Sequence, residues 1–186
     1  TVHAAITLPD SGTLDVTTGI TNPDVPRTLT ITGNQAGIVG NVVIEGTDAA
    51  GNAISDTIAA NGTSTVEGVR AFKTVTKITV PAKNASGDTI SVGTAKKLGL
   101  PHKVYNAACL LVKLFNGAAD SGTLSVNSEL SKNLFALNGT PDGSKVAPSN
   151  PATGKFRSVF DVELKQQGTY RIGTYNSGLS ASWKEG

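Results

Sequence analysis

The sequence predicts an all-β protein, a β-sandwich or barrel module followed by a second β-rich region. Apolar and polar residues alternate with a period of two in many short stretches, which is the pattern of strands with one buried face. Turn residues separate these stretches, and the 186-residue chain contains 21 glycines and 8 prolines. A chain of this length can enclose a core without disulfides or metals.

Strand and turn signals follow one another through the first hundred residues. One stretch places Leu29 and Ile31 on one face and threonines on the other, which predicts a half-buried antiparallel strand. Residues 41–46 and 53–58 repeat this alternation on either side of residues 48–52, whose glycine and asparagine permit positive φ angles. This arrangement predicts a β-hairpin.

Two positions break the alternation. Asp56 has the same parity as the isoleucines on either side of it, so a regular strand would turn its carboxyl group toward the core. That position requires a bulge or a carboxyl group whose hydrogen bonds are satisfied locally. Val75 is out of phase with Ile78 and Val80, which predicts an extra strand residue near residues 76–77.

The second half of the chain continues the β pattern with one ambiguous segment. Residues 107–115 are the most apolar run and predict a central strand, and residues 156–164 alternate strictly, with residues 168–172 as their expected partner. Leucines spaced through residues 128–139 fit a short amphipathic helix and a strand equally well. Residues 139–155 are rich in proline and glycine and predict an exposed loop.

These signals divide the chain into four parts. Residues 1–21 are expected to form an N-terminal arm and residues 22–101 an Ig-like β module, with a soft boundary near residue 100. A second β-rich region follows at residues 102–175, and residues 176–186 are expected to form a C-terminal tail.

The charge pattern gives no support to a nucleic-acid or membrane partner. The formal net charge is +2, from 16 basic and 14 acidic residues, and both signs are scattered along the chain. No stretch approaches the roughly 18 apolar residues of a membrane-spanning helix, and no signal-peptide pattern precedes the first strand. We therefore expect cytoplasmic synthesis. The start at Thr1 fits removal of an initiator Met, and cleavage of a longer leader would look the same.

Residues suited to catalysis or metal binding are few. His3 and His102 are the only histidines, and neither has metal-ligand spacing. Cys109 lies in an apolar run and is expected to be a buried hydrophobic residue that reacts slowly with thiol reagents. No nucleophile elbow, phosphate-binding loop or dinucleotide fingerprint is present. The sequence predicts a protein that is not an enzyme and needs no metal or cofactor.

Motifs in the first half resemble those of a family of tailed-phage virion structural proteins. The chain carries Asn22-Pro23-Asp24-Val25-Pro26-Arg27 and closes the module with Lys97-Leu98-Gly99-Leu100-Pro101. Between them stand Val43-Ile44-Glu45-Gly46-Thr47-Asp48, the Asn-Gly-Thr turn in residues 58–63, and the threonine-rich strand of residues 73–81. The resemblance covers about residues 20–101 and weakens afterwards.

The resemblance implies a decoration (cement) protein that binds and stabilises the phage capsid shell. Its partner would be the lattice of the major capsid protein, its location the capsid exterior after synthesis in the host cytoplasm, and its assembly a homotrimer. Many modest contacts on a repeating surface suffice for such binding, and binding only the assembled shell stabilises it. A tail-associated virion protein and a bacterial Ig-like adhesion or carbohydrate-binding module stay open as alternatives, although 5% aromatic residues fit a carbohydrate platform poorly.

Apolar residues near both ends are the candidate interface with other subunits or with the lattice. They lie outside the motif-bearing module, and exposed apolar side chains gain little in solvent. The candidates are Val2, Ile6, Leu8, Leu179 and Trp183. The alternative is that both ends pack on their own domain.

Overall fold

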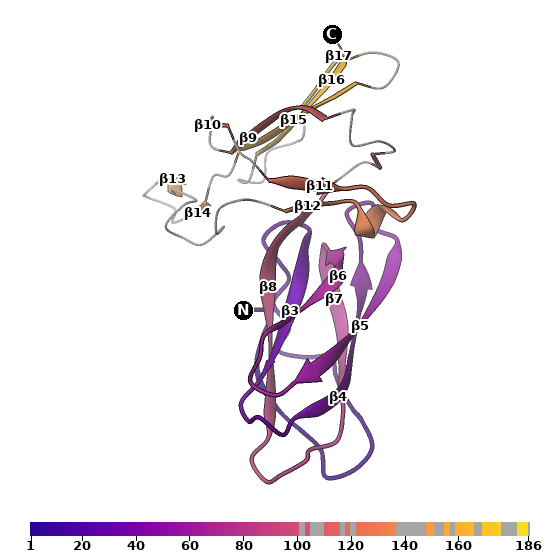
Figure 1. Cartoon of the computed structure of the whole chain (residues 1–186), viewed down its shortest axis with the longest axis vertical. Coiled ribbons are helices and arrows are strands. Elements are labelled where there is room, and N and C mark those ends of the chain that lie inside the picture. Colours follow the sequence, from indigo (N-terminus) through magenta and orange to yellow (C-terminus); the bar gives the residue numbers. More distant parts are fainter. Residues whose placement is uncertain are drawn as a thin grey trace. The chain divides into compact units, whose positions relative to one another are not determined.

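The structure is a computed structural model of the 186-residue chain. It describes residues 1–100, 103–104, 110–115, 118–119, 122–136, 148–150, 155–156, 159–165, 169–175 and 182–185. Contacts divide the chain into unit 1, Thr1–His102 with Leu130–Lys132, and unit 2, Lys103–Glu129 with Asn133–Gly186. Strands build both units, and the described residues contain no α-helix (Figure 1). The predicted all-β fold is confirmed.

The first sheet of unit 1 is antiparallel and includes the N-terminal segment. β8 (Thr89–Gly99) pairs with β3 (Arg27–Gly33), and β3 pairs on its other side with β6 (Val66–Phe72). β1 (His3–Thr7) pairs with β8, with Ile6 opposite Ile90.

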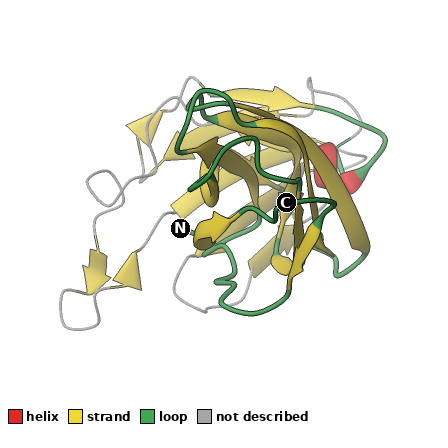
Figure 2. Cartoon of the chain, turned by 90° about the horizontal axis from the view of Figure 1, so that it is seen from below, coloured by secondary structure: helices red, strands yellow, loops and turns green. Residues whose placement is uncertain are grey.

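The second sheet of unit 1 has the strand order β2-β7-β4-β5. Its strands are β2 (Leu14–Val16), β7 (Thr74–Val80), β4 (Val39–Thr47) and β5 (Ala53–Asn61). β4 and β5 form the predicted hairpin, and Asp48 stabilises the loop by accepting the backbone N–H groups of Ala50 and Asn52, each at 2.9 Å. Viewed from the end of unit 1, the strands curl around an interior (Figure 2).

The core of unit 1 forms where the alternating apolar residues of both sheets meet. Leu29 and Ile31 are buried while Thr30 and Thr32 are half-buried, as predicted for this strand. The same alternation buries residues of the other strands, and the core cluster comprises Val2, Ile6, Leu8, Leu29, Ile31, Ile38, Val42, Ile44, Ile58, Phe72, Val75, Ile78, Val80, Ile90 and Val92.

The predicted extra residue in the seventh strand is present. Lys77 lies opposite Glu45 and Val75 opposite Gly46, so Thr76 is an additional residue in β7. A Cβ atom on Gly46 would collide with the carbonyl oxygen of Thr74, so a glycine is needed where β4 approaches the bulge. The bulge brings Val75 inward in spite of its parity.

Asp56 is buried without any break in its own strand. β4 and β5 pair in continuous register, and Ile58 and Asp56 both face inward. One carboxylate oxygen of Asp56 accepts the backbone N–H groups of Val69 at 2.8 Å and of Arg70 at 3.0 Å. Of the two expected solutions, the structure shows a carboxyl group with satisfied hydrogen bonds.

Both neighbouring strands of β3 contain a bulge opposite the same part of β3. Thr28 pairs with Ala71 and Thr30 with Glu67, so β6 carries two additional residues there. On the other side Arg27 pairs with Leu98 and Leu29 with Thr94, so β8 also carries two. Bulges of this kind leave backbone groups without a ladder partner, and these groups need side chains to satisfy them.

Unit 2 contains a sheet with the order β10-β9-β15-β16-β17 and two short hairpins. The sheet strands are β9 (Leu110–Phe115), β10 (Ala118–Ala119), β15 (Val159–Lys165), β16 (Thr169–Tyr175) and β17 (Ser182–Glu185). The hairpins are β11 (Thr123–Ser125) with β12 (Leu134–Ala136), and β13 (Pro148–Asn150) with β14 (Lys155–Phe156).

Unit 2 follows the predicted strands only in part. β15 and β16 pair antiparallel, as predicted for residues 156–164 and 168–172, but Phe156 belongs to β14. The ambiguous segment contains both a 3₁₀ turn at Leu130–Lys132, which belongs to unit 1, and the strand β12 of unit 2. β13 lies where a loop was predicted, because its short backbone pairing does not need an apolar pattern.

The expected N-terminal arm of residues 1–21 and C-terminal tail of residues 176–186 each contain a described strand that pairs with a neighbour. Residues 3–7 form β1 of the first sheet, and residues 182–185 form β17, which pairs with β16. Both segments find open strand edges within their own unit, and main-chain hydrogen bonds hold them there.

Candidate functional site

The three N-terminal interface candidates are part of the unit 1 core. Val2, Ile6 and Leu8 expose 1%, 4% and 3% of their surface. Val2 donates its backbone N–H to Val92, and Leu8 donates to Asp88. Their assignment to a lattice interface is therefore wrong, because side chains buried in this fold have no surface to offer a partner.

The C-terminal interface candidates are described only in part. Trp183 lies on β17 opposite Ile172 of β16, and only its backbone position is described. Leu179 falls outside the described residues, as do His102 and Cys109. The interface role of Leu179 and Trp183 and the burial of Cys109 stay predictions.

Residues that could ligate a metal ion do not gather in the described part of the chain. His3 is half-buried, and its Nδ1 atom lies 2.7 Å from the backbone oxygen of Ala4. No group of three or more His, Cys, Asp or Glu side chains among the described residues could hold a metal ion. No described helix is long and apolar enough to cross a membrane.

Side chains of the Asn22–Arg27 motif bind backbone groups at two of the bulges, and we call these contacts the polar joint. Arg27 is 7% exposed, and its Nε and Nη2 atoms donate to the carbonyl oxygen of Ala95 in the β8 bulge at 2.9 and 2.6 Å. Its Nη1 atom contacts Asp24 at 3.1 Å. Asn22 accepts the backbone N–H of Val75, beside the β7 bulge, at 2.8 Å.

The two motifs at the borders of the module meet in space. Gly99 donates its backbone N–H to the carbonyl oxygen of Pro26 at 2.7 Å. A Cβ atom on Gly99 would lie against Ala71 and Pro26, so the contact depends on a glycine. The motif residues Pro26, Arg27 and Gly99 thus hold the fold together.

Removing the Asn22 side-chain acceptor tests this joint. Asn22→Ala should lower the free energy of unfolding by about 1 kcal/mol, because the N–H of Val75 loses its partner. Amide hydrogen exchange at Val75, measured by NMR, should accelerate. Asn22→Asp keeps an acceptor and is the matched control. Equal exchange at Val75 in both variants would contradict the role of this contact.

The loops at one end of unit 1 are bound to each other. Asn34 donates to the carbonyl oxygen of Gly87 at 2.9 Å and accepts the N–H of Thr89 at 2.8 Å, which joins the β3–β4 and β7–β8 loops. Lys83 forms an ion pair with Asp10 of the β1–β2 loop, and its ammonium group lowers the pKa of Asp10 below the ordinary value.

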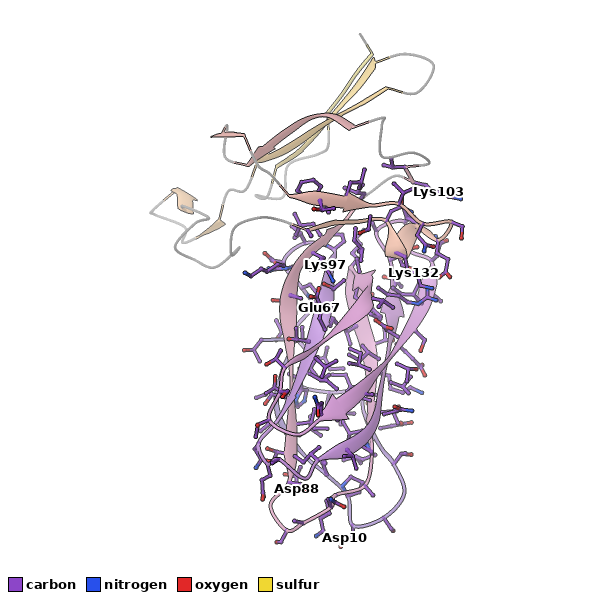
Figure 3. All side chains as sticks on the ribbon, in the orientation of Figure 1. Asp10, Glu67, Asp88, Lys97, Lys103 and Lys132 are labelled. Atoms are coloured by element: carbon purple, nitrogen blue, oxygen red, sulfur yellow. The ribbon has the colours of Figure 1, made fainter. Side chains whose placement is uncertain are left out.

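Asp88 lies beneath this loop end. It exposes 1% of its surface, and one carboxylate oxygen accepts the N–H groups of Asn84 and Ala85, each at 2.9 Å. Figure 3 shows Asp10 and Asp88 at one end of unit 1, far from Glu67 and Lys97, which form an ion pair of 3.4 Å. The loop end is therefore a preorganised surface of polar loops.

A cluster of paired charges lies on the outer face of the second sheet. Lys77 lies between strands β2 and β4, with its Nζ atom 2.9 Å from Glu45 and 3.8 Å from Asp15. The hydrogen bond to Glu45 raises the pKa of Lys77 above the ordinary lysine value. The contribution of this pair to stability is complete below the ordinary lysine pKa and is lost as the pH rises through the raised value.

Comparison of the chain with protein-family models, with curated proteins and with solved structures gives no match. Function has to be inferred from the residues and their contacts.

Sequence reasoning anticipated the burial of Asp56 but missed its backbone partners and the structural task of Arg27. Arg27 and Asp56 are both buried, and each binds backbone groups of a bulge beside β3. The inward parity of Asp56 was a visible signal of its burial. No local signal pointed to Arg27, because its acceptor, Ala95, lies 68 residues away in the sequence.

Proposed function

We propose that this chain is a structural protein of a tailed-phage particle that binds the assembled capsid shell as a decoration (cement) protein. The observation that carries the proposal is the resemblance of residues 20–101 to virion structural proteins. In this proposal the chain is not an enzyme, its partner is the major capsid protein lattice on the capsid exterior, and it assembles as a homotrimer.

The described geometry is compatible with binding to a protein surface. Asn34, Lys83 and Asp88 hold three loops of unit 1 in place, so a partner that contacts this end would pay little entropy for ordering them. The outer face around Lys77 is polar with paired charges. Such a surface suits specific protein contacts better than charge-driven binding to nucleic acid.

Buried charges support binding over catalysis. The described residues contain four buried charged side chains, Arg27, Asp48, Asp56 and Asp88, and each of them binds backbone groups of its own fold. A catalytic group must be able to reach a substrate. Burial keeps these four side chains away from one.

The C-terminal segment is the remaining candidate for the contact with other subunits. Trp183 is the only tryptophan of the chain and lies on β17, the last strand of its sheet order. Tryptophan residues often dominate the binding energy of interfaces. We therefore place Leu179 and Trp183 in the proposed interface and withdraw Val2, Ile6 and Leu8 from it.

Microscopy of particles with and without the protein tests the proposal. Particles that lack the protein should regain regular surface density when it is added back, and their shells should resist higher temperatures, because the protein binds only the assembled lattice. Density confined to the tail would favour the tail-associated alternative. No binding to either structure would contradict a virion role.

The same assay tests the proposed interface. Trp183→Ala should reduce the number of bound copies while the melting temperature of the isolated protein stays unchanged, and Trp183→Phe is the control that keeps an aromatic ring. Full occupancy with Trp183→Ala would remove this residue from the interface.

A further inference from the structure

Unit 1 has two outermost strands on the same side of the sandwich. β5 ends the strand order of the second sheet, and β6 ends the strand order of the first on the side away from β8. The two strands follow one another through the turn at Asn61–Ser64, where the N–H of Ser64 donates to the carbonyl oxygen of Asn61 at 3.0 Å. Open strand edges can pair with strands of other molecules.

β5 lacks the common protection of an edge strand on its outer face. Its outward positions carry small uncharged side chains, and the strand contains no proline or lysine. The exposed residues are Ala53, Ser55, Thr57, Ala59 and Asn61. The strand has one charged residue, Asp56, and it points inward. An inward-pointing charge is a known device against edge-to-edge pairing, because a new neighbouring strand would have to bury it.

Asp56 also occupies the other edge. The N–H groups of Val69 and Arg70 lie in the β6 bulge, where they have no ladder partner on β3, and the Asp56 carboxylate accepts both of them. Gly68 makes room for this contact, because a Cβ atom there would collide with the same carboxylate oxygen. The bulge also leaves Val69, at 56% exposure, as one of the exposed large apolar residues of the described chain.

We propose that Asp56 guards both edges, so that its carboxylate prevents β5 and β6 of one molecule from pairing with the same strands of a second copy. A second copy is the relevant partner because a lattice-bound protein stands at high local concentration beside identical chains. The inference concerns the isolated protein in solution, so it can fail or succeed independently of the proposed particle function.

The test compares Asp56→Ala with a variant of similar stability that leaves both edges intact. Val92→Ala removes buried core volume on β8 and serves as that control. At equal folded fraction, the sedimentation-velocity mass of Asp56→Ala should rise with protein concentration beyond that of the wild type, while Val92→Ala should follow the wild type. Amide exchange of Val69 and Arg70 should accelerate about tenfold in Asp56→Ala relative to the control.

A second substitution separates edge protection from simple destabilisation. Thr57 is exposed on β5, so Thr57→Lys places an outward charge on this edge. In the Asp56→Ala background, Thr57→Lys should restore the wild-type mass without restoring the stability. The lysine supplies a charge that opposes strand pairing at the edge, but it does not replace the hydrogen bonds of Asp56. Unchanged association in the double variant would overturn the proposal, as would association of Val92→Ala equal to that of Asp56→Ala.

Asp56→Asn covers the case in which Asp56→Ala does not fold. An amide oxygen can still accept the two N–H groups, but the buried charge is lost. This variant should associate more than the wild type, and Thr57→Lys should again suppress the association. A chain with Asp56→Asn that keeps the wild-type mass at every concentration would also overturn the proposal.

Discussion

Deletion of residues 1–9 is expected to unfold unit 1. The deletion removes strand β1 and three core side chains, those of Val2, Ile6 and Leu8. Burial of one such side chain stabilises a fold by about 1.5–3 kcal/mol, and whole domains are stable by only about 5–15 kcal/mol. The loss is therefore comparable with the entire stability of an ordinary domain.

Hydrogen exchange measured by mass spectrometry reports this loss within the full chain. Peptides from residues 27–99 should lose most of their protection in the deletion variant. A control that changes the exposed positions Ala4, Ala5 and Thr7 to serine keeps the buried face of β1 and should retain protection. Unaltered protection of residues 27–99 after the deletion would mean that the N-terminal segment is an arm after all.

Arg27→Ala is expected to lower the free energy of unfolding of unit 1 by about 3 kcal/mol. The substitution leaves the carbonyl oxygen of Ala95 buried without the two donors that Arg27 supplies. It also removes the partner of Asp24, but that pair is partly exposed and contributes little.

Urea denaturation, followed by hydrogen exchange of peptides from residues 1–100, measures the effect of Arg27→Ala. Lys73→Ala removes the same charge from an exposed position and should change the stability by less than about 0.5 kcal/mol. Arg27→Lys should fall between the two, because an ammonium group cannot reproduce the planar guanidinium geometry. A loss no larger for Arg27→Ala than for Lys73→Ala would show that the contact to Ala95 is unimportant.

The strands of unit 1 were predictable because one face of each strand is buried. The alternation of Leu29 and Ile31 and the phase slip at Val75 both depend on neighbours in the sequence, and the structure confirms both. The position of β1 was not predictable in this way. Ile6 is the buried residue of β1, and its partner Ile90 lies far away in the sequence. Alternation of apolar and polar residues does not identify a pairing partner.

The candidate site was harder to predict for a related reason. Short motifs identify residues that belong together in the sequence, whereas the task of each residue depends on what the fold brings near it. Arg27 belonged to a recognisable motif, but its contact with Ala95 follows from the β8 bulge. For Trp183, the sequence predicts an anchoring aromatic residue, and the structure adds its place on β17.

The residues that bind the bulges beside β3 and in β7 maintain the architecture of the module, whereas other surface residues can vary. Asn22, Arg27 and Asp56 use their hydrogen-bonding groups on backbone atoms of the bulges. Two chains that share these residues can therefore share an architecture while they recognise different surfaces. The module is accordingly suited to protein engineering as a display scaffold: new recognition sequences can be grafted into the tip of the Asp48–Asn52 loop while the polar joint stays intact.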